Sequence, residues 1–214
     1  MTNLLFDYDG TLHNSIKIYA PAFRTAYIYL VENGFADFKE FSDQEISYWL
    51  GFTVNDMWKS FLPNLPEKEK KKCGAMIGKE MIRLINMGMA ELYPQAENIL
   101  MKLKDQGYNL VFLSNCKRAY KEAHIKQFRL NHYFSSFYCS EDFGFIPKHE
   151  IFKTIKENCS GDYIVIGDRF QDMEISKIHN LPSVGCLYGY GAPDEIQHAT
   201  YKINNLSDIL PLFL

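Results

Sequence analysis

Short apolar runs spaced along the chain constrain its fold more strongly than any other feature. Five of them are mostly apolar at both odd and even positions: Leu4–Tyr8, Leu110–Ser114, Phe137–Ser140, Tyr163–Ile166 and Ser183–Leu187. A strand that is apolar on both faces has to be covered on both faces, which is typical of parallel sheets. The pattern therefore predicts buried parallel strands rather than an open antiparallel sheet.

Segments with helical spacing lie between these runs. They cover Ala96–Gln106, Ala119–Phe128, Ile151–Asn158 and Met173–His179. Because predicted strands and helices alternate, the chain is expected to be an α/β protein, with a Rossmann-like parallel sheet and helices on both faces.

The alternation fails after the first strand. From about residue 16 to residue 90 one helical pattern follows another, beginning with an apolar stripe at Ala20, Phe23, Tyr27 and Leu30. The stretch Glu67–Met89 has a second helical pattern. We therefore predict an all-helical domain at 16–90, inserted into a core domain made of 1–15 and 91–214.

Charge and composition argue against several classes of protein. The 214 residues carry a net charge of -3, so there is no basic excess to bind nucleic acid. No apolar run approaches the roughly 20 residues that a membrane span needs. Five cysteines without a C-x-x-C pair indicate reduced thiols rather than disulfides or a zinc site. We expect a soluble cytoplasmic protein.

Polar residues with chemical potential follow the predicted strands. Ligands of open α/β sheets bind beyond the carboxyl ends of the strands, so the residues at these positions are the candidate site residues. They are Asp7, Asp9, Gly10 and Thr11 after the first strand, Ser114 and Asn115 after the second, Lys148 after the central loop, and Asp168 and Asp172 in "GDRFQD".

Parallel neighbouring strands would bring the four aspartates into one crevice. Clustered carboxylates need a cation to remain ionised together, and an oxygen-only set suits Mg2+. The lysine, the hydroxyl and the glycine turn are donors suited to phosphate oxygens. Phosphoryl transfer is therefore predicted, although each piece alone has a plain structural reading as a turn, a helix cap or a surface lysine.

The same stretches resemble a known family. In this order, "FDYDGTLHNS", "VFLSN", Lys148 and "IGDRFQD" are similar to the four motifs of the haloacid dehalogenase-like hydrolase superfamily. The resemblance is to the subgroup with a helical cap between the first two motifs, which includes phosphoglycolate phosphatases and β-phosphoglucomutases. It covers nearly the whole chain and implies a capped α/β core with phosphatase activity.

The resemblance also implies residue roles. Asp7 matches the nucleophile that forms an aspartyl-phosphate, and Asp9 matches the general acid/base. For that second role Asp9 should be protonated when substrate arrives, and crowding by like charges is expected to raise its pKa. An aspartate at this position also argues against a dehalogenase.

The implied ligands follow by the same match. Mg2+ would be held by Asp7, Asp168 and the backbone carbonyl of Asp9, with Asp172 in support. Phosphate would be held by Ser114, Asn115 and Lys148 and by the backbone N–H groups of Gly10 and Thr11.

Two positions depart from the family pattern. Relatives usually have Asp where this chain has Asn14, and many place the third-motif lysine before a proline, whereas the order here is Pro147-Lys148-His149. Lys117 and Lys153 are the alternative third-motif lysines.

The cap is expected to set specificity. In "LGFTVND", residues Gly51, Phe52 and Thr53 are predicted to face the substrate, with His13 and Asn14 on the opposite wall. An alternative is that Phe52 belongs to the cap core with Trp49 and Trp58.

The sequence thus predicts a Mg2+-dependent phosphomonoesterase that acts on a small soluble phosphorylated metabolite, as a monomer or weak homodimer. Phosphoglycolate, sugar phosphates, nucleotides and pyrophosphate all remain candidate substrates. A phosphomutase and a non-catalytic regulatory module on the same fold are the alternatives.

Overall fold

A six-stranded parallel sheet forms the centre of the molecule in the computed structural model, which describes residues 1–213. Its strands are β1 (Thr2–Phe6), β2 (Asn109–Ser114), β3 (Ser136–Cys139), β4 (Asp162–Gly167), β5 (Ser183–Cys186) and β6 (Tyr201–Ile203). Their spatial order is β3-β2-β1-β4-β5-β6, and every neighbouring pair is parallel. The predicted α/β fold is confirmed.

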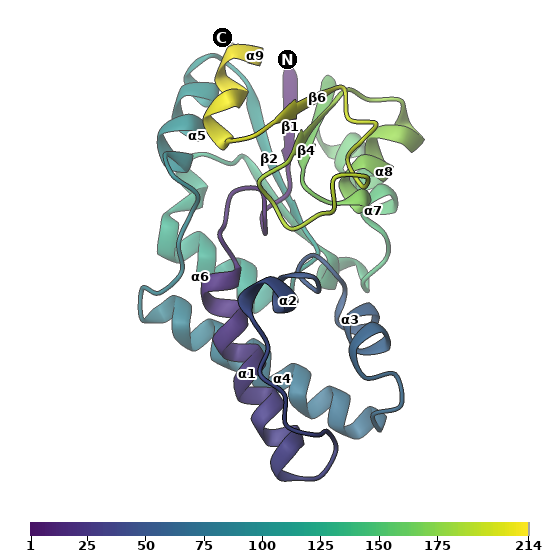
Figure 1. Cartoon of the computed structure of the whole chain (residues 1–214). Coiled ribbons are helices and arrows are strands. Elements are labelled where there is room, and N and C mark those ends of the chain that lie inside the picture. Colours follow the sequence, from purple (N-terminus) through teal and green to yellow (C-terminus); the bar gives the residue numbers. More distant parts are fainter. Residues whose placement is uncertain (214) are drawn as a thin grey trace.

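Helices cover both faces of this sheet, as Figure 1 shows. The helices of the core are α5 (Ala96–Asp105), α6 (Arg118–Phe128), α7 (Lys148–Asn158), α8 (Phe170–His179) and α9 (Leu210–Phe213). Alternation along β1 explains the two layers. Phe6 is buried in the same cluster as Leu100 of α5, whereas Leu5 is buried in another cluster with Phe152 of α7. The central strand β1 therefore needs apolar side chains on both faces.

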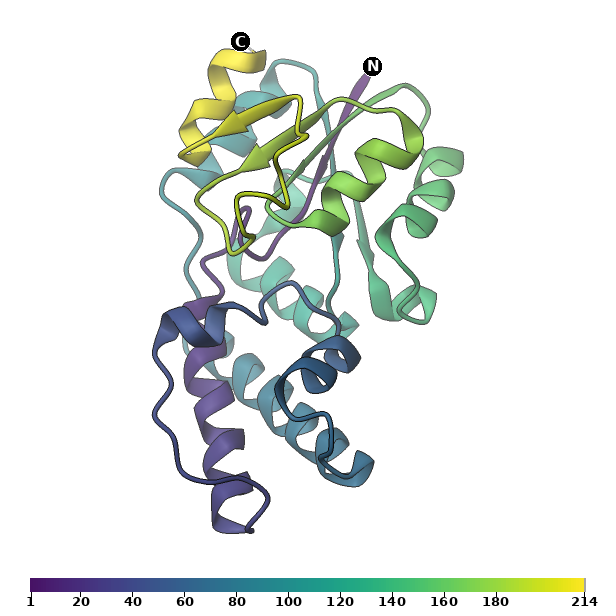
Figure 2. The same ribbon diagram turned by 45° about the vertical axis from the view of Figure 1, so that its right-hand side comes forward.

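The segment between β1 and α5 is helical. It holds α1 (Ile16–Glu32), α2 (Asp43–Ser47), α3 (Val54–Phe61) and α4 (Glu67–Asn86). These helices have a hydrophobic cluster of their own, in which Phe23 of α1 stacks on Trp49 with 5.3 Å between the ring centroids. Trp58 is buried in the same cluster. We call α1–α4 the cap, and Figures 1 and 2 show it at one end of the sheet.

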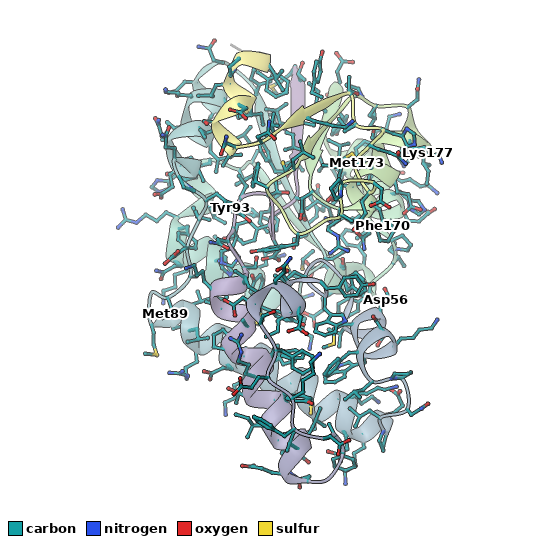
Figure 3. All side chains as sticks on the ribbon, viewed as in Figure 1. Asp56, Met89, Tyr93, Phe170, Met173 and Lys177 are labelled. Carbon is teal, nitrogen blue, oxygen red and sulfur yellow. The ribbon has the colours of Figure 1, made fainter. Side chains whose placement is uncertain are left out.

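The strands run toward the cap. β1 starts at the N-terminus, far from the cap, so the carboxyl ends of the parallel strands face it (Figures 1 and 2). In Figure 3, Phe170 at the start of α8 marks the core side of this boundary and Asp56 of α3 marks the cap side. The predicted chemical residues therefore lie between sheet and cap. No helix within residues 1–213 is long and apolar enough to cross a membrane.

Candidate active site

Three aspartates meet where β1 and β4 end. Phe6 and Ile166 are paired in the sheet, so Asp7 and Asp168 follow at neighbouring strand ends. The Asp172 carboxylate accepts a hydrogen bond from the backbone N–H of Arg169 at 3.1 Å, which caps the start of α8. Carboxylate oxygens of Asp7, Asp168 and Asp172 lie within 4.8 Å of one another. The three form a compact, buried acidic cluster.

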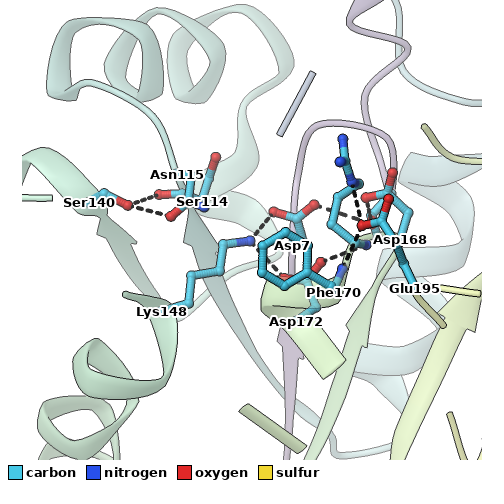
Figure 4. A network of polar contacts seen from close by, with 11 residues as sticks. Asp7, Ser114, Asn115, Ser140, Lys148, Asp168, Phe170, Asp172 and Glu195 are labelled. Atoms are coloured by element: carbon cyan, nitrogen blue, oxygen red, sulfur yellow. Dashed lines mark hydrogen bonds and ion pairs between the residues drawn. The ribbon is translucent and has the colours of Figure 1, made fainter. Parts of the chain in front are cut away.

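Lys148 lies inside this cluster. Its Nζ donates to Asp7 Oδ1 at 2.6 Å and to Asp172 Oδ1 at 2.7 Å (Figure 4). Burial alone would lower the pKa of Lys148, but the charges of Asp172 and Asp7 hold it above its usual value. Among the alternatives, Lys153 pairs with Glu150 at the surface and Lys117 is exposed before α6. Lys148 is therefore the lysine that neutralises the acidic cluster.

One lysine does not balance three buried carboxylates. Burial raises the pKa of Asp7 well above its usual value, and the charges of Asp172 and Asp168 add to this while Lys148 opposes it. Burial and the charge of Asp172 also raise the pKa of Asp168 to about 7. A hard divalent cation among these oxygens would offset the excess negative charge. The acidic cluster therefore fits a cation such as Mg2+, and metal binding stays a prediction.

Gly10 lets the chain turn tightly against the acidic cluster. Its φ is +91°, and a Cβ atom there would lie 2.3 Å from Asp168 Oδ2. We expect Gly10→Ala to reduce the free energy of unfolding by at least about 2 kcal/mol, because backbone strain and a clash add. Gly34→Ala is the matched control in thermal denaturation, since Gly34 also has a positive φ of +72° but nothing within 4 Å of the added atom. Equal losses in the two variants would contradict the clash.

The carboxylate of Asp9 is not part of the acidic cluster and has partners of its own. Its Oδ1 accepts hydrogen bonds from Ser15 Oγ and from Tyr120 Oη, both at 2.6 Å, and lies 3.0 Å from His13 Nδ1. Burial by itself would raise the pKa of Asp9, but hydrogen bonds from His13, Ser15 and Tyr120 lower it to about 2. The expected rise in this pKa is wrong for the arrangement seen here. The physical reason is that donors, not carboxylates, surround Asp9.

The turn after β1 uses its own backbone donors. The N–H of Gly10 donates to the carbonyl of His13 at 3.0 Å, and the N–H of Thr11 donates to the carbonyl of Tyr8 at 3.3 Å. Both groups therefore already have backbone acceptors in this structure, and their contact with phosphate stays a prediction. The Thr11 hydroxyl instead lies 3.5 Å from Asp7 Oδ2 and 3.4 Å from Asp168 Oδ1.

A cavity of about 480 Å³ lies between core and cap and is lined by residues of both. Its core side includes Asp7, Asp9, Lys148 and the two residues at the end of β2, Ser114 and Asn115. The Ser140 hydroxyl donates to Asn115 Oδ1 at 2.6 Å and orients that amide (Figure 4). The structure therefore brings the predicted nucleophile, acid/base and phosphate-binding side chains to one cavity.

Two of the five predicted specificity residues, Gly51 and Phe52, also line the cavity. The other three do not. Thr53 caps α3 by accepting from the N–H of Asp56, and the side-chain carbonyl of Asn14 accepts from the Tyr190 hydroxyl. His13 is fully buried beside Asp9. Nearby donors and acceptors engage these three residues in this structure, and their contact with substrate stays a prediction.

Arg169 is a site residue that the sequence did not reveal. Its side chain is buried, donates to the carbonyl of Leu50, and lies 5.1 Å from the centroid of the Phe52 ring. Glu195 accepts from its Nε at 3.0 Å and holds it in place. This arginine joins the loop after β4 to the cap. The only signal in the sequence was its position directly after Asp168. An arginine exposed at the surface could occupy the same position, so the sequence did not single it out.

Comparison with solved structures shows the same fold elsewhere. A predicted phosphatase from Clostridium acetobutylicum is 22% identical, with 99% of this chain and 97% of that chain covered and a TM-score of 0.82. A predicted phosphoglycolate phosphatase from Haemophilus somnus is 21% identical, with the same coverage and a TM-score of 0.81. A putative phosphatase from Clostridium difficile is 23% identical, also with the same coverage, at 0.80. None of the curated proteins matches this chain in sequence.

The family model of haloacid dehalogenase-like hydrolases matches residues 4–186. This range contains all four stretches on which the resemblance was based, from "FDYDGTLHNS" to "IGDRFQD". It confirms the resemblance and the prediction of a hydrolase. With the match extending over most of its length, the chain belongs to the haloacid dehalogenase-like hydrolase family.

Proposed function

We propose that this protein is a phosphomonoesterase that requires Mg2+ and passes through a phosphoryl ester on Asp7. The observation that carries the proposal is the contact between Lys148 and two carboxylates of the acidic cluster, at the floor of a cavity that also includes Ser114. A lysine so placed steadies a carboxylate nucleophile and can also attract a phosphate oxygen. The names of the similar solved structures support the same class: a predicted phosphatase, a putative phosphatase and a predicted phosphoglycolate phosphatase.

In the first step, a carboxylate oxygen of Asp7 attacks phosphorus. The bond between phosphorus and the ester oxygen breaks, and the leaving alcohol takes up a proton. Asp9 lines the same cavity and is proposed to supply that proton after it leaves His13, Ser15 and Tyr120 and takes up a proton from solvent. Once the contacts with His13, Ser15 and Tyr120 are lost, burial is the main influence that remains on the carboxyl group, and burial raises its pKa.

In the second step, water attacks the phosphorus of the phosphoryl ester. Asp9, now a carboxylate, takes a proton from that water, inorganic phosphate leaves, and Asp7 returns to its ionised form. Asp7, Asp168 and the backbone carbonyl of Asp9, supported by Asp172, would hold Mg2+. When bound, the ion would screen the repulsion between Asp7 and the phosphate.

We propose that the substrate is a small phosphorylated metabolite and that the protein works in a reducing compartment such as the cytoplasm. The cysteines are all free thiols, and four of them are buried.

The test is release of inorganic phosphate from a panel of sugar phosphates, nucleotides, phosphoglycolate, pyrophosphate and p-nitrophenyl phosphate. We expect release that falls at least about 100-fold in EDTA and returns with Mg2+. Equal release in EDTA would overturn the metal requirement. Isomerised sugar phosphate without free phosphate would favour a mutase. A folded sample that releases no phosphate from any of these compounds would count against the phosphatase.

Asp168→Asn tests the metal ligands directly. Removing one charge from the acidic cluster is expected to raise the Mg2+ concentration for half-maximal activity by at least about tenfold. Asp162→Asn is the matched control, because Asp162 lies at the opposite, exposed end of the same strand. If both variants had the same Mg2+ requirement as the wild type, Asp168 would not be a ligand.

A further inference from the structure

The two sides of the active-site cavity differ in chemistry. The core side carries the charged and polar groups at the strand ends. The cap side is mainly apolar and includes Trp49, Leu50, Phe52, Met57, Ile77 and Ile82. Leu50, Met57 and Ile77 are also buried in the cap cluster, so they form a fixed wall rather than loose surface side chains. We call these six residues the apolar wall.

Helix α4 opens space beside this wall. Two of its interior residues are glycines, Gly74 and Gly78, and both line the cavity together with Ala75. A Cβ atom added at Gly78 would meet nothing within 4 Å, so the missing side chain leaves empty volume. Glycine destabilises a helix interior relative to alanine. Gly78 is therefore explained by the space that it leaves in the cavity, since no close neighbour requires a glycine at this position.

Few polar groups face the body of a substrate on the cap side. The Arg169 guanidinium is near the apolar wall but is already engaged by Glu195 and by the Leu50 carbonyl. Lys79 and Lys117 belong to the lining but are exposed to solvent. Gln171 Oε1 is one buried acceptor of the lining that has no hydrogen-bond partner within the described residues. A polyhydroxylated alcohol could use that acceptor but would bury its other hydroxyl groups without partners, which is unfavourable.

We propose that the leaving group of the substrate is an apolar alcohol with one or two rings, or an alkyl body of similar size. This inference rests on the proposed phosphatase function. A cavity of about 150 Å³ holds one benzene molecule. The cavity here measures about 480 Å³, so it can take a phosphate group together with such a body. The phosphate would face Asp7 and Lys148, and the body would contact the apolar wall.

The test compares esters of primary alcohols, whose leaving groups have similar reactivity. We expect kcat/KM for 2-phenylethyl phosphate to exceed that for glycerol phosphate and glucose 6-phosphate by at least about 100-fold, since each buried methylene contributes about a factor of four. Equal or better turnover of the two polyol phosphates would overturn the proposal.

Binding of a non-hydrolysable compound separates this proposal from the phosphatase function. Calorimetry with 2-phenylethylphosphonate is expected to give at least tenfold tighter binding than methylphosphonate in the presence of Mg2+. If no ester is hydrolysed but this preference is found, the phosphatase function fails and the apolar site stands. If esters are hydrolysed and the preference is absent, the apolar site fails alone.

Gly78→Leu fills the proposed space from the helix. We expect it to lower the ratio of kcat/KM for 2-phenylethyl phosphate to kcat/KM for methyl phosphate at least tenfold. Gly78→Ala is the matched control, because it adds the same favourable helix propensity but only one methyl group, and it should change the ratio less than threefold. Thermal denaturation checks that both variants are folded. An unchanged ratio in folded Gly78→Leu would contradict the placement of the leaving group.

Discussion

Replacing Asp7 with Asn is expected to lower kcat for phosphate release by at least about 10⁴-fold. The amide is uncharged and cannot form the phosphoryl ester that the proposed reaction needs. The loss should appear for every substrate, because Asp7 acts on phosphorus and not on the leaving group. Phosphate release is the measurement, with the wild-type protein prepared in parallel.

The same variant should remain folded. Asp7 is buried beside Asp172 and Asp168, whose charges raise its pKa, so removing its charge relieves repulsion in the acidic cluster. Lys148 keeps its second partner, Asp172 Oδ1, at 2.7 Å. We therefore expect an unchanged circular dichroism spectrum and a midpoint of thermal unfolding no lower than that of the wild type. Residual activity within tenfold of the wild type, in a folded sample, would show that Asp7 is not the nucleophile.

Replacing Lys148 with Met should damage both activity and stability. The variant leaves three buried carboxylates without their cation, and breaking a buried ion pair of this kind costs about 3–5 kcal/mol. The side chain is 4% exposed, so solvent cannot take the place of the lysine charge. We also expect kcat to fall at least about 10³-fold, since the nucleophile loses its fixed position and phosphate loses a donor.

Lys153→Met is the matched control for stability. Lys153 lies on the same helix, is 57% exposed, and pairs with Glu150 at 2.6 Å. A surface pair of this kind contributes at most about 1 kcal/mol. Both variants should be compared by denaturant unfolding in EDTA, so that no metal ion replaces the missing charge. If Lys148→Met were as stable as Lys153→Met, the lysine would not be needed to hold the acidic cluster together.

The sheet was predictable because its signal is local. Leu4, Leu5 and Phe6 are apolar without alternation, and both faces of β1 are indeed buried. β6 was missed because Tyr201 and Lys202 are exposed, so the three-residue strand lacks an apolar pattern. Pattern reasoning therefore works where burial determines the side chains on both faces, and fails for a short edge strand.

The acidic cluster could also be foreseen, even though Asp7 and Asp168 are far apart in the chain. Parallel strands end at the same edge of a sheet, so residues that follow two neighbouring strands must meet. Lys148 could be named only as the best of three lysines. The structure selects Lys148 because this residue begins α7, which places its Nζ 2.6 Å from Asp7 Oδ1.

The environment of Asp9 could not be read from the sequence. In the sequence, Asp7 lies two residues from Asp9 and suggested charge repulsion between the two carboxylates. In the folded protein, hydroxyl groups donate hydrogen bonds to Asp9 instead. One of them, Tyr120, comes from α6, 111 residues away. His13 was likewise assigned to the substrate wall, but it stacks on Tyr8 with 5.2 Å between ring centroids and is fully buried.

The sequence by itself determined the parallel sheet, the helical insertion and the set of residues at the strand ends, because apolar periodicity and chain order are local properties. Only the tertiary structure decided which lysine neutralises the aspartates, how Asp9 is held, and that the cap presents an apolar wall to the cavity. These features depend on side chains from distant segments, and their pKa values and contacts follow from burial and from neighbours that packing alone brings together.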